Sequence, residues 1–336
     1  MKRYYPILLT TILTTFLGCS DDRKFPEVRN LTFYKETEIL PTLEHAISKD
    51  KNALYSSSLL FAWDDIRKRI EQPINIDNSF TDLILLNNSK SFMKSLDSNE
   101  YYGTGKIEDG VVKVRAEFSK SLPFELKLTS FTNQLTFDGK KVESFGKVGY
   151  DNHSEGIIQI LYYKDDNNFI LKLLPRDKEH EIILFKSSDT YKSMGEILPL
   201  IANKIMVGKK EKITVKKGWR YNLTDEDEVV IPKFKFNIEN NYVSIEGKNF
   251  KGGNQNYLIE TAYQRTAFIL DESGAEIESE AEVELMLDDV EEEETKPHPK
   301  KMRFDKPFFL MLKRVDCDNP YFGLWTNNSE LMVIEK

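Results

Sequence analysis

The sequence has 336 residues, of which 40% are hydrophobic and 12% aromatic, enough to bury one large core or two ordinary ones. Its formal charge of -8 argues against nucleic acid or an anionic membrane surface as a partner, because both select for basic patches. The histidines are scattered without ligand spacing, so the sequence predicts no metal site and no cofactor.

The first eighteen residues have the features of a bacterial export signal. Lys2 and Arg3 precede an apolar stretch from Ile7 to Leu17. This stretch is too short to span a bilayer, which needs ~20 residues. Gly18-Cys19 resembles the lipobox, in which the cysteine becomes the lipidated first residue of the mature protein. An ordinary signal peptide with a chance cysteine is the alternative.

Lipidation of Cys19 would place the protein at the outer membrane. Ser20-Asp21-Asp22 resembles the export tag of surface lipoproteins, so we expect a position on the cell surface. Cys317 is then left unpaired, and no disulfide framework is expected. Residues 19–35 are polar and are interpreted as a tether, and residues 36–336 as a single domain without repeats or long linkers.

The remaining chain predicts helices first and strands afterwards. Apolar residues recur every three to four positions in Glu36 to Ile47 and in Ala53 to Ile70, which favours two helices. Short β-type runs bounded by Gly, Pro, Asn and Asp follow at Val112 to Ala116, Ile157 to Tyr163, Phe169 to Leu174, Ile182 to Phe185, Val229 to Phe236 and Phe308 to Leu312. The stretch from Ile160 to Leu174 predicts a hairpin that turns at Asp166 to Asn168. The predicted fold class is α+β.

Catalytic motifs give no support for an enzyme. The run Ser56-Ser57-Ser58 lacks the glycine elbow that would expose a nucleophile. No Walker loop is present, and Gly252-Gly253 indicates only a turn. Paired carboxylates carry no weight in a chain with 55 acidic residues.

The stretch SGAEIESEAEVELMLDDVEEEE, which begins at Ser273, alternates between two kinds of residue. Small or apolar side chains fall on every second position, and glutamates fill the gaps between them. A period of two is typical of a strand with one buried and one exposed face. The segment is thus predicted to be able to become such a strand.

Several motifs, in a shared order, resemble those of the serpin family of serine protease inhibitors. Phe304 to Leu312 (FDKPFFLML), followed by Tyr321-Phe322-Gly323, resembles the family signature near the C-terminus, and Ile231 to Phe236 (IPKFKF) resembles an earlier strand. Weaker likenesses lie at Asn52 and Ser56, at Ala116, Phe118, Pro123 and Phe124, at Trp219, and in the hairpin segments around Tyr162 and Leu174. Together the likenesses cover roughly residues 52–70 and 111–336.

The resemblance implies a large central mixed sheet, smaller sheets, N-terminal helices and an exposed reactive-centre loop, here residues 271–303. The segment from Gln72 to Gly110 is too short for the family's usual helices, so some of the helices that lie over the main sheet are expected to be missing.

In serpins a protease cuts this loop and becomes acylated. It is then carried along as the freed strand inserts into the main sheet. The resemblance therefore implies a monomeric inhibitor of an extracellular serine or cysteine protease. The hinge and loop residues that it assigns here are Glu272, Gly274, Ala275, Ile277, Ser279, Ala281, Val283 and Leu285. All but Glu272 and the pivot Gly274 would point inward after insertion, and the glutamates from Glu276 to Glu284 would point outward.

The charge of these glutamates does not forbid insertion. Neighbouring outward carboxylates ~7 Å apart repel by ~0.6 kcal/mol in water before salt screening. Burying Ile277, Val283 and Leu285 returns about 1.5 to 3 kcal/mol each.

Three alternatives remain from the sequence. The uncleaved segment could be an acidic surface helix, because Ala, Glu, Leu and Met are strong helix formers. The protein could be a non-inhibitory serpin, because Ile277 and the glutamates depart from the family's small hinge residues. Such a non-inhibitory protein would bind a ligand or partner instead. The chain could also be a surface lipoprotein of another fold, in which the acidic loop is only a spacer.

The scissile bond has two candidate positions. Counting forward from Gly274 by the family's spacing points to Met286-Leu287, and counting back from Pro307 points to Lys296. Leu287 would suit an elastase- or chymotrypsin-like enzyme, whereas Pro297 would shield Lys296 from trypsin-like cleavage.

Overall fold

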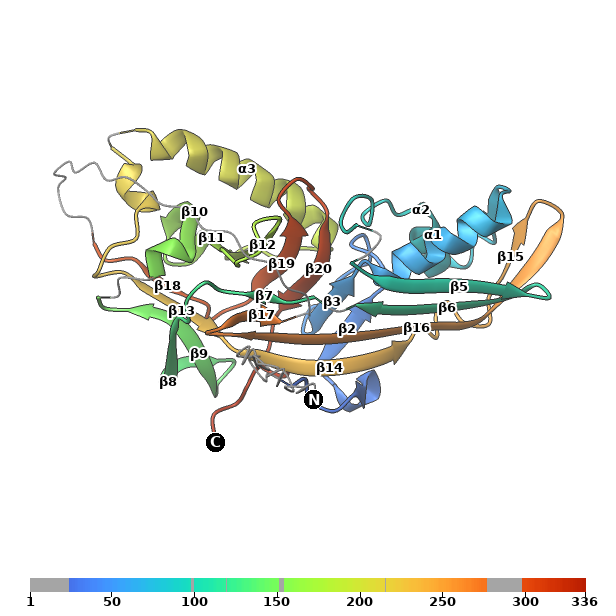
Figure 1. The fold of residues 1–336 in the computed structure, drawn as a ribbon, viewed down its shortest axis with the longest axis horizontal. Coiled ribbons are helices and arrows are strands. Elements are labelled where there is room, and N and C mark those ends of the chain that lie inside the picture. Colours follow the sequence, from blue (N-terminus) through green and yellow to red (C-terminus); the bar gives the residue numbers. More distant parts are fainter. Residues whose placement is uncertain (1–23, 98–99, 119, 151–153, 215, 277–297) are drawn as a thin grey trace, which may run out of the picture.

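The computed structural model describes residues 24–97, 100–118, 120–150, 154–214, 216–276 and 298–336. Within these residues the chain forms three β-sheets and three α-helices, and it has the α+β fold class that the sequence predicts (Figure 1). In the described part of the chain, no helix has both the length and the apolar character needed to cross a membrane.

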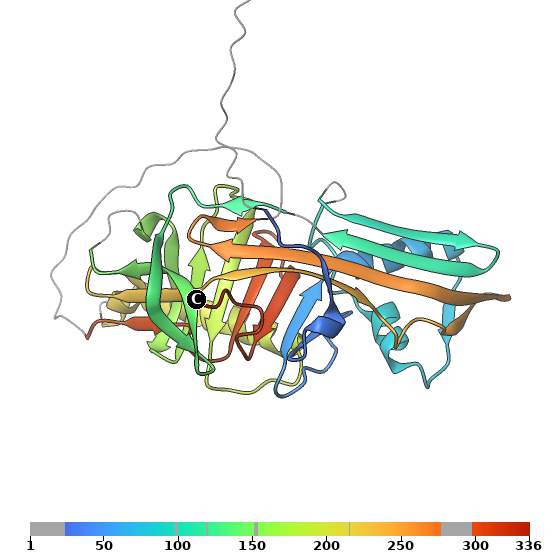
Figure 2. The same ribbon diagram turned by 90° about the horizontal axis from the view of Figure 1, so that it is seen from below.

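The central sheet has nine strands and runs along the long axis of the molecule (Figure 2). Its longest member is β16 (Gln255–Asp271), which pairs antiparallel with β14 (Phe234–Asn241) and parallel with β6 (Val111–Phe118). The other strands are β1 (Arg29–Asn30), β4 (Ile74–Ile76), β5 (Tyr102–Glu108), β7 (Leu122–Pro123), β15 (Asn249–Gly252) and β17 (Gly274–Glu276).

A seven-stranded sheet packs against the central sheet. Its strands are β10 (Ile158–Asp165), β11 (Asn168–Leu173), β12 (His180–Lys186), β19 (Phe308–Arg314), β20 (Pro320–Thr326), β3 (Asn52–Ser56) and β2 (Thr37–Leu40), in that order. Phe268 of the central sheet stacks on Phe322 of this sheet with ring centroids 4.5 Å apart. Both faces are covered, so β19 and β20 consist of nearly continuous apolar runs rather than alternating ones.

The third sheet has four strands, β18 (Lys301–Arg303), β13 (Glu228–Pro232), β9 (Lys140–Val148) and β8 (Thr129–Phe137). The sequence predicted a single strand from Val229 to Phe236. The structure divides it at Lys233 into β13 and β14, which belong to different sheets. The predicted hairpin is confirmed, because Asp165 pairs with Asn168 across the turn between β10 and β11.

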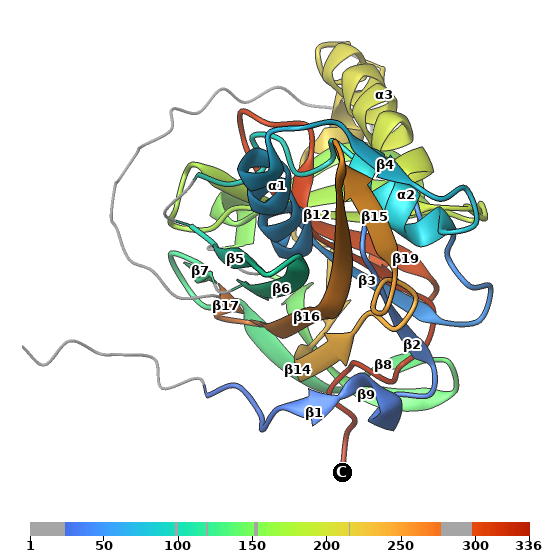
Figure 3. The same ribbon diagram turned by 90° about the vertical axis from the view of Figure 1, so that its right-hand side faces the viewer.

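The helices are α1 (Ser58–Ile70), α2 (Thr81–Asn88) and α3 (Met194–Lys212), and short 3-10 turns occur at Leu31–Phe33, Ser154–Gly156 and Gly218–Tyr221. Figure 3 shows α1 lying against one face of the sheet that β5, β6 and β16 form. Gly105 of β5 touches α1 so closely that a Cβ there would lie 2.4 Å from Ile66. In Figure 1, α3 lies over β10, β11 and β12.

Two helix predictions need correction. Residues 36–47 do not form a helix, because Thr37 to Leu40 pair in parallel with Asn52 to Tyr55 as strand β2. The second helix is real but begins at Ser58, since the preceding residues from Asn52 to Ser56 are the fully buried strand β3.

The boundaries of the predicted tether and loop also overlap with regular structure. Arg29 and Asn30 pair with Ile238 and Glu239 as strand β1, so the folded body includes residues that precede Glu36. At the other boundary, β17 and β18 lie inside the segment 271–303. The expected scarcity of helices is confirmed within the described residues.

Candidate functional site: a hinge strand at the head of a seam

The candidate site is the short strand β17, which follows β16 after a two-residue turn. Gly274 pairs with Asp271 of β16 on one side and with Pro123 of β7 on the other, and Ala275 pairs with Leu270 and Leu122. The turn is held by Ser273, whose amide donates to the Asp271 carboxylate at 2.8 Å. β17 therefore lies between two strands of the central sheet and is not a free loop.

Gly274 is required by this geometry. Its φ is +121°, a region that side chains rarely adopt, and a Cβ would lie 2.4 Å from the Leu122 carbonyl oxygen. The amide of Phe124 donates to the Ser273 carbonyl at 2.8 Å, which holds the hinge against this neighbouring segment. The predicted special role of Gly274 thus has a steric basis.

The flanking hinge residues Glu272 and Ala275 are both anchored. Ala275 is completely buried beneath the sheet. The Glu272 carboxylate lies 2.7 Å from the Lys233 ammonium, and the Glu272 carbonyl accepts a hydrogen bond from the Leu128 amide at 2.9 Å. Lys233 is the residue at which the chain passes from the four-stranded sheet to the central sheet, so this ion pair ties the hinge to both.

Below β17, strands β6 and β16 meet along a parallel ladder of eight residue pairs, from Val111 and Leu258 to Phe118 and Thr266. We call this ladder the seam. A parallel ladder is slightly less stable per residue than an antiparallel one. A strand that continued from β17 into the seam would run antiparallel to both of its walls.

The two walls of the seam are in register with the hinge. Gly274 pairs with Asp271 on one wall and with Pro123 on the other. These two partners are as far apart in the sequence as Thr266 and Phe118, which pair with each other in the seam. The offset persists down to the pair of Thr261 and Lys113, beyond which a bulge follows. A strand extended from β17 could therefore pair with both walls without either wall sliding along its axis.

The register also fixes which side chains would face inward. Ala275 is opposite Leu270, so the following odd-numbered residues fall opposite Phe268, Thr266, Gln264 and Ala262, all of which are buried. The first even-numbered residues fall opposite Ile269 and Ala267, which are also buried, and the next two fall opposite Arg265 and Tyr263, which are partly exposed. This is the parity that the period-two pattern predicts for the small and apolar set.

The outer face of the seam carries three basic side chains. Lys113 and Arg115 of β6 are exposed there, and Arg265 of β16 is partly exposed, although Lys113 already forms an ion pair with Glu260 at 2.9 Å. Arg115 lies over the Tyr263 ring, 5.6 Å from its centroid, and the Arg265 guanidinium donates to Asn237 at 2.9 Å. This face can offer positive charge to an acidic strand.

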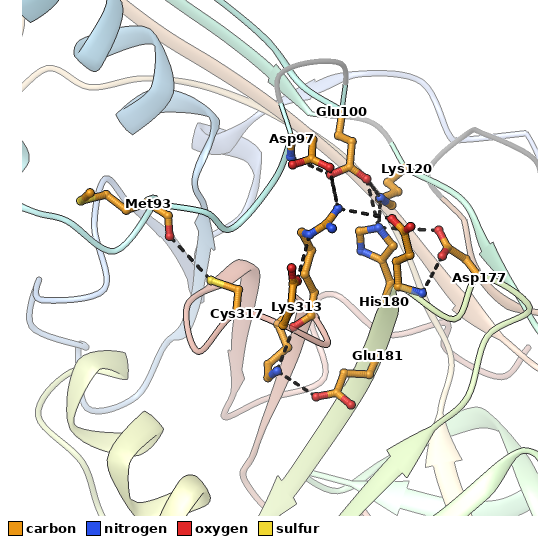
Figure 4. Close-up of polar contacts among 12 residues, drawn as sticks. Met93, Asp97, Glu100, Lys120, Asp177, His180, Glu181, Lys313 and Cys317 are labelled. Carbon is orange, nitrogen blue, oxygen red and sulfur yellow. Dashed lines mark hydrogen bonds and ion pairs between the residues drawn. The ribbon is translucent and has the colours of Figure 1, made fainter.

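A buried polar cluster lies where the chain passes from β6 to β7 (Figure 4). The Lys120 ammonium contacts both Glu100 and His180, and the His180 Nε2 lies 3.0 Å from the Glu100 carboxylate. Arg314 at the end of β19 lies 2.9 Å from Asp97 and 3.3 Å from Glu100. The cluster ties the β6 end of the seam to the seven-stranded sheet.

The charges of this cluster are set by burial and by Lys120. Burial, and then the neighbouring Lys120 ammonium, lower the pKa of His180 to about 4, so its ring is neutral at pH 7. Burial opposes ionisation of Glu100, but the hydrogen bonds from Lys120 and the Asp97 amide, together with the charge of Lys120, outweigh it, and the pKa of Glu100 falls to about 2. Burial also lowers the pKa of Lys120.

The other predicted site residues lie outside the described residues. These are Ile277, Ser279, Ala281, Val283 and Leu285 of the loop, the scissile candidates Leu287 and Lys296, and Cys19. The structure thus brings together only Glu272, Gly274 and Ala275 from that set.

Sequence reasoning missed the residues that hold the hinge, Leu122 and Lys233, and the cluster around Lys120 and His180. All act through contacts between distant parts of the chain, for which one sequence carries no periodic signal. Lys233 stood within the IPKF motif, but nothing in that motif indicated an ion pair with Glu272.

No family model and no curated protein matches the sequence. Among solved structures the chain is similar to a serpin from the trematode Schistosoma haematobium, with a TM-score of 0.39 and 10% identity over 66% of this chain and 57% of that one. It is also similar to the Schistosoma mansoni serpin, with a TM-score of 0.37 and 11% identity over 66% and 56% of the two chains. The thermophilic serpin tengpin has a TM-score of 0.34 and 13% identity over 78% and 64%.

The chain thus spans less than two thirds of the length of these serpins. By its own sheets and helices the molecule is an α+β protein, with three sheets and three α-helices among its described residues. Its described residues contain few helices, and the motifs that resemble those of serpins occur in a shared order along its sequence.

Proposed function

We propose that the protein is a protease inhibitor of the serpin type. A serine or cysteine endopeptidase cuts the loop after β17 and becomes acylated, and the freed strand then inserts into the seam. The observation that carries the proposal is the position of β17, which already pairs with β16 and β7 at the head of the seam and in register with both walls. We further propose that a lipid on Cys19 holds the inhibitor at the outer surface of the cell.

The register favours one of the two scissile candidates. Counting from Ala275 and its two partners, the residue opposite Leu258 at the last pair of the seam is Leu287, and the residue opposite Val111 is Met286, one position apart because of the bulge. A cut after Leu287 would free just enough chain to fill the seam. A cut after Lys296 would leave a further stretch without a place in the ladder.

The proposal is tested by mixing the purified protein with elastase, chymotrypsin and trypsin. The expected result is a band resistant to SDS at the summed mass of inhibitor and protease, with the acyl bond mapped by mass spectrometry to Leu287. Cleavage of the loop with no such band, for all three proteases and across enzyme ratios, contradicts the trapping mechanism.

A matched pair of variants separates insertion from cleavage. Ile277→Glu places a carboxylate on the inward face opposite the buried Phe268, so it should abolish the covalent complex while cleavage continues. Glu280→Gln changes an outward position, opposite the partly exposed Arg265, and should leave the complex intact. If both variants trapped equally well, insertion in this register would be excluded.

The alternative is a non-inhibitory serpin-fold protein that binds a ligand or partner. Glu276, whose backbone pairs with Ile269, is the observation that favours it, because a charged residue at the head of the seam departs from the small residues of inhibitory hinges. This alternative predicts clean cleavage without trapping in the same assay.

A further inference from the structure

Two large apolar side chains project into water close to the start of the described chain. Phe33, in the 3-10 turn Leu31–Phe33, is 72% exposed, and Val243, which follows β14, is 79% exposed. The parallel pairing of β1 with β14 brings the turn alongside the end of β14. We call Phe33 and Val243 the apolar pair.

The turn that carries Phe33 is firmly held. The Asn30 side chain accepts hydrogen bonds from the Thr32 amide at 3.0 Å and from the Thr32 hydroxyl at 2.8 Å. The Lys35 ammonium donates to the Thr32 carbonyl at 2.9 Å, and the Lys35 amide donates to the Glu330 carboxylate at 2.7 Å. The exposure of Phe33 is therefore part of the folded structure and is not caused by a frayed chain end.

The surroundings of both side chains are ordered as well. Leu31 and Tyr34 are partly buried and pack against the hydrophobic core, so Phe33 alone of this short run is exposed. Val243 lies in a turn that the Ile245 amide closes by donating to the Tyr242 carbonyl at 2.8 Å. Single exposed apolar side chains are common on protein surfaces, so the position of this pair decides what it means.

The apolar pair lies on the side of the molecule from which the predicted tether leaves. Lys24 is five residues from Cys19, so even a fully extended chain keeps it within about 18 Å of that residue. Figure 2 shows the blue start of the described chain and the turn on the face toward the viewer. In Figures 1 and 3 this blue segment lies at the bottom and α3 at the top. A lipid on Cys19 would thus place the bilayer beside Phe33 and leave α3 on the far side.

We propose that Phe33 and Val243 insert into the surface of the bilayer that carries the lipid and so fix the orientation of the protein on the membrane. The inference rests on the lipid on Cys19 that is part of the proposed function. Apolar side chains leave water when they enter the boundary between headgroups and acyl chains. This contact needs no anionic lipid, against which the formal charge of -8 argues.

The test uses the chain from Cys19 to Lys336, which contains every described residue. Cys317→Ser leaves Cys19 as the single thiol, which is coupled to a maleimide phospholipid in phosphatidylcholine vesicles. This chemical anchor makes the test independent of lipidation in the cell. The tryptophan introduced by Val243→Trp reports the contact, because bromine atoms on the acyl chains of the vesicle lipid quench its fluorescence.

Brominated vesicles should reduce the fluorescence added by Val243→Trp by at least half relative to unbrominated ones. Leu200→Trp, at an exposed apolar residue of α3, is the matched reporter, and its quenching should be at least threefold smaller. Phe33→Ser in the Val243→Trp chain should reduce the quenching at least threefold. Ile213→Ser, at a residue directly after α3 that is 86% exposed, should leave the quenching unchanged.

Thermal melting checks that each variant keeps its fold. Absence of bromine quenching in Val243→Trp overturns the proposal. Equal quenching of the two reporters overturns it as well, because the protein would then have no fixed orientation, and so does quenching that Phe33→Ser leaves unchanged. Native lipidation is tested separately by the mass of protein purified from membranes, and protease trapping by the SDS-resistant complex, so failure of either is distinguishable from failure of this proposal.

Discussion

Gly274 and Gly139 both have positive φ angles, +121° and +73°, but they differ in their surroundings. A Cβ at Gly274 would overlap the Leu122 carbonyl and approach the Pro123 Cα to 2.7 Å. A Cβ at Gly139 would meet nothing within 4 Å. Substituting alanine at both positions therefore separates the free-energy cost of a positive φ, which both share, from the cost of steric overlap, which only Gly274 has.

Gly274→Ala is therefore expected to displace β17 from between β7 and β16, whereas Gly139→Ala should carry only the conformational cost of about 1 kcal/mol. Native-state hydrogen exchange reports the difference, because the Phe124 amide is bonded to Ser273 only while the hinge is in place. The Phe124 amide should lose protection in Gly274→Ala alone. Unchanged protection in that variant would mean that the hinge strand is held elsewhere.

His180 gives a pH dependence with a defined window. Its pKa is about 4 in the fold, against about 6.5 in an unfolded chain, so between these values only the unfolded chain takes up the proton. Stability is therefore full above pH 6.5 and falls by up to about 3 kcal/mol as the pH drops to 4. The loss from Glu100, whose pKa is about 2, comes only below its unfolded value near 4.5.

Urea denaturation between pH 4 and 7 measures this dependence. His180→Gln should reduce the slope between pH 6.5 and 4, because glutamine takes up no proton, and the part that remains is due to His45, whose pKa burial also lowers. His298→Gln, at an exposed histidine, should retain the slope. A wild-type stability that stays constant across this window would contradict the assignment to His180.

At the scale of elements, the basic outer face of β6 and β16 matches the glutamate pattern of the loop. Extending the register of β17 places Glu280 opposite Arg265, Glu282 opposite Arg115 and Glu284 opposite Lys113. Exposed pairs of this kind contribute about 0.2–1 kcal/mol each. They would offset the repulsion among the glutamates and would weaken as salt screens them.

Arg115→Glu is thus expected to raise the stoichiometry of inhibition, the number of inhibitor molecules consumed per trapped protease, by up to about fivefold at low salt. The double variant Arg115→Glu/Glu282→Arg should restore the wild-type stoichiometry, because it exchanges the two charges. Lys140→Glu, an equal charge change on β9, is the control. A double variant as impaired as the single one would refute the pairing of these two positions.

The sequence predicted most strands of the seven-stranded sheet, because their runs are short, apolar and bounded by turn residues. It failed where a helical period and strand pairing compete. Residues 36–47 carry a helical spacing, yet Thr37 to Leu40 pair with β3, an interaction that only the folded chain reveals. Helix α3 was missed because Pro199 and Gly208 interrupt its pattern, although Gly208 lets the helix approach Leu161 closely.

The site was predictable to a similar degree. The serpin resemblance singled out Gly274, whose φ of +121° requires a glycine, whereas the parity that alternation predicts for the loop concerns residues outside the described ones and stays a prediction. The partners of the hinge, Leu122 and Lys233, lie far away in sequence and belong to different sheets. Their identity follows from strand register, which no single segment of this chain encodes.

At the scale of the whole molecule, the central sheet packs across the seven-stranded sheet and continues past it over α1 (Figures 1 and 3). The seam lies in the part over α1 and is the one parallel ladder between long strands among the described residues of this sheet. Replacing it by two antiparallel ladders adds backbone hydrogen bonds as well as apolar burial. The inserted form should therefore be the more stable state.

Cleavage of the loop is accordingly expected to raise the melting temperature. Burial of Ile277, Val283 and Leu285 at about 1.5–3 kcal/mol each corresponds to an increase of about 10 °C or more. Differential scanning calorimetry of intact and clipped protein measures it, with clipped Ile277→Glu as the control. A clipped wild-type protein that melts at the same temperature as the intact one would exclude insertion.

The seam and the hinge share one strand register, so the length of the linker between Phe118 and Leu122 determines whether an inserted strand can pair with both walls. Shortening the linker by a single residue would shift the register of the inserted strand against one wall by one residue relative to the other wall. The apolar side chains of the inserted strand would then match the buried positions of one wall and the exposed positions of the other. Selection on this linker should consequently act on its length as well as on Lys120, which the buried cluster fixes.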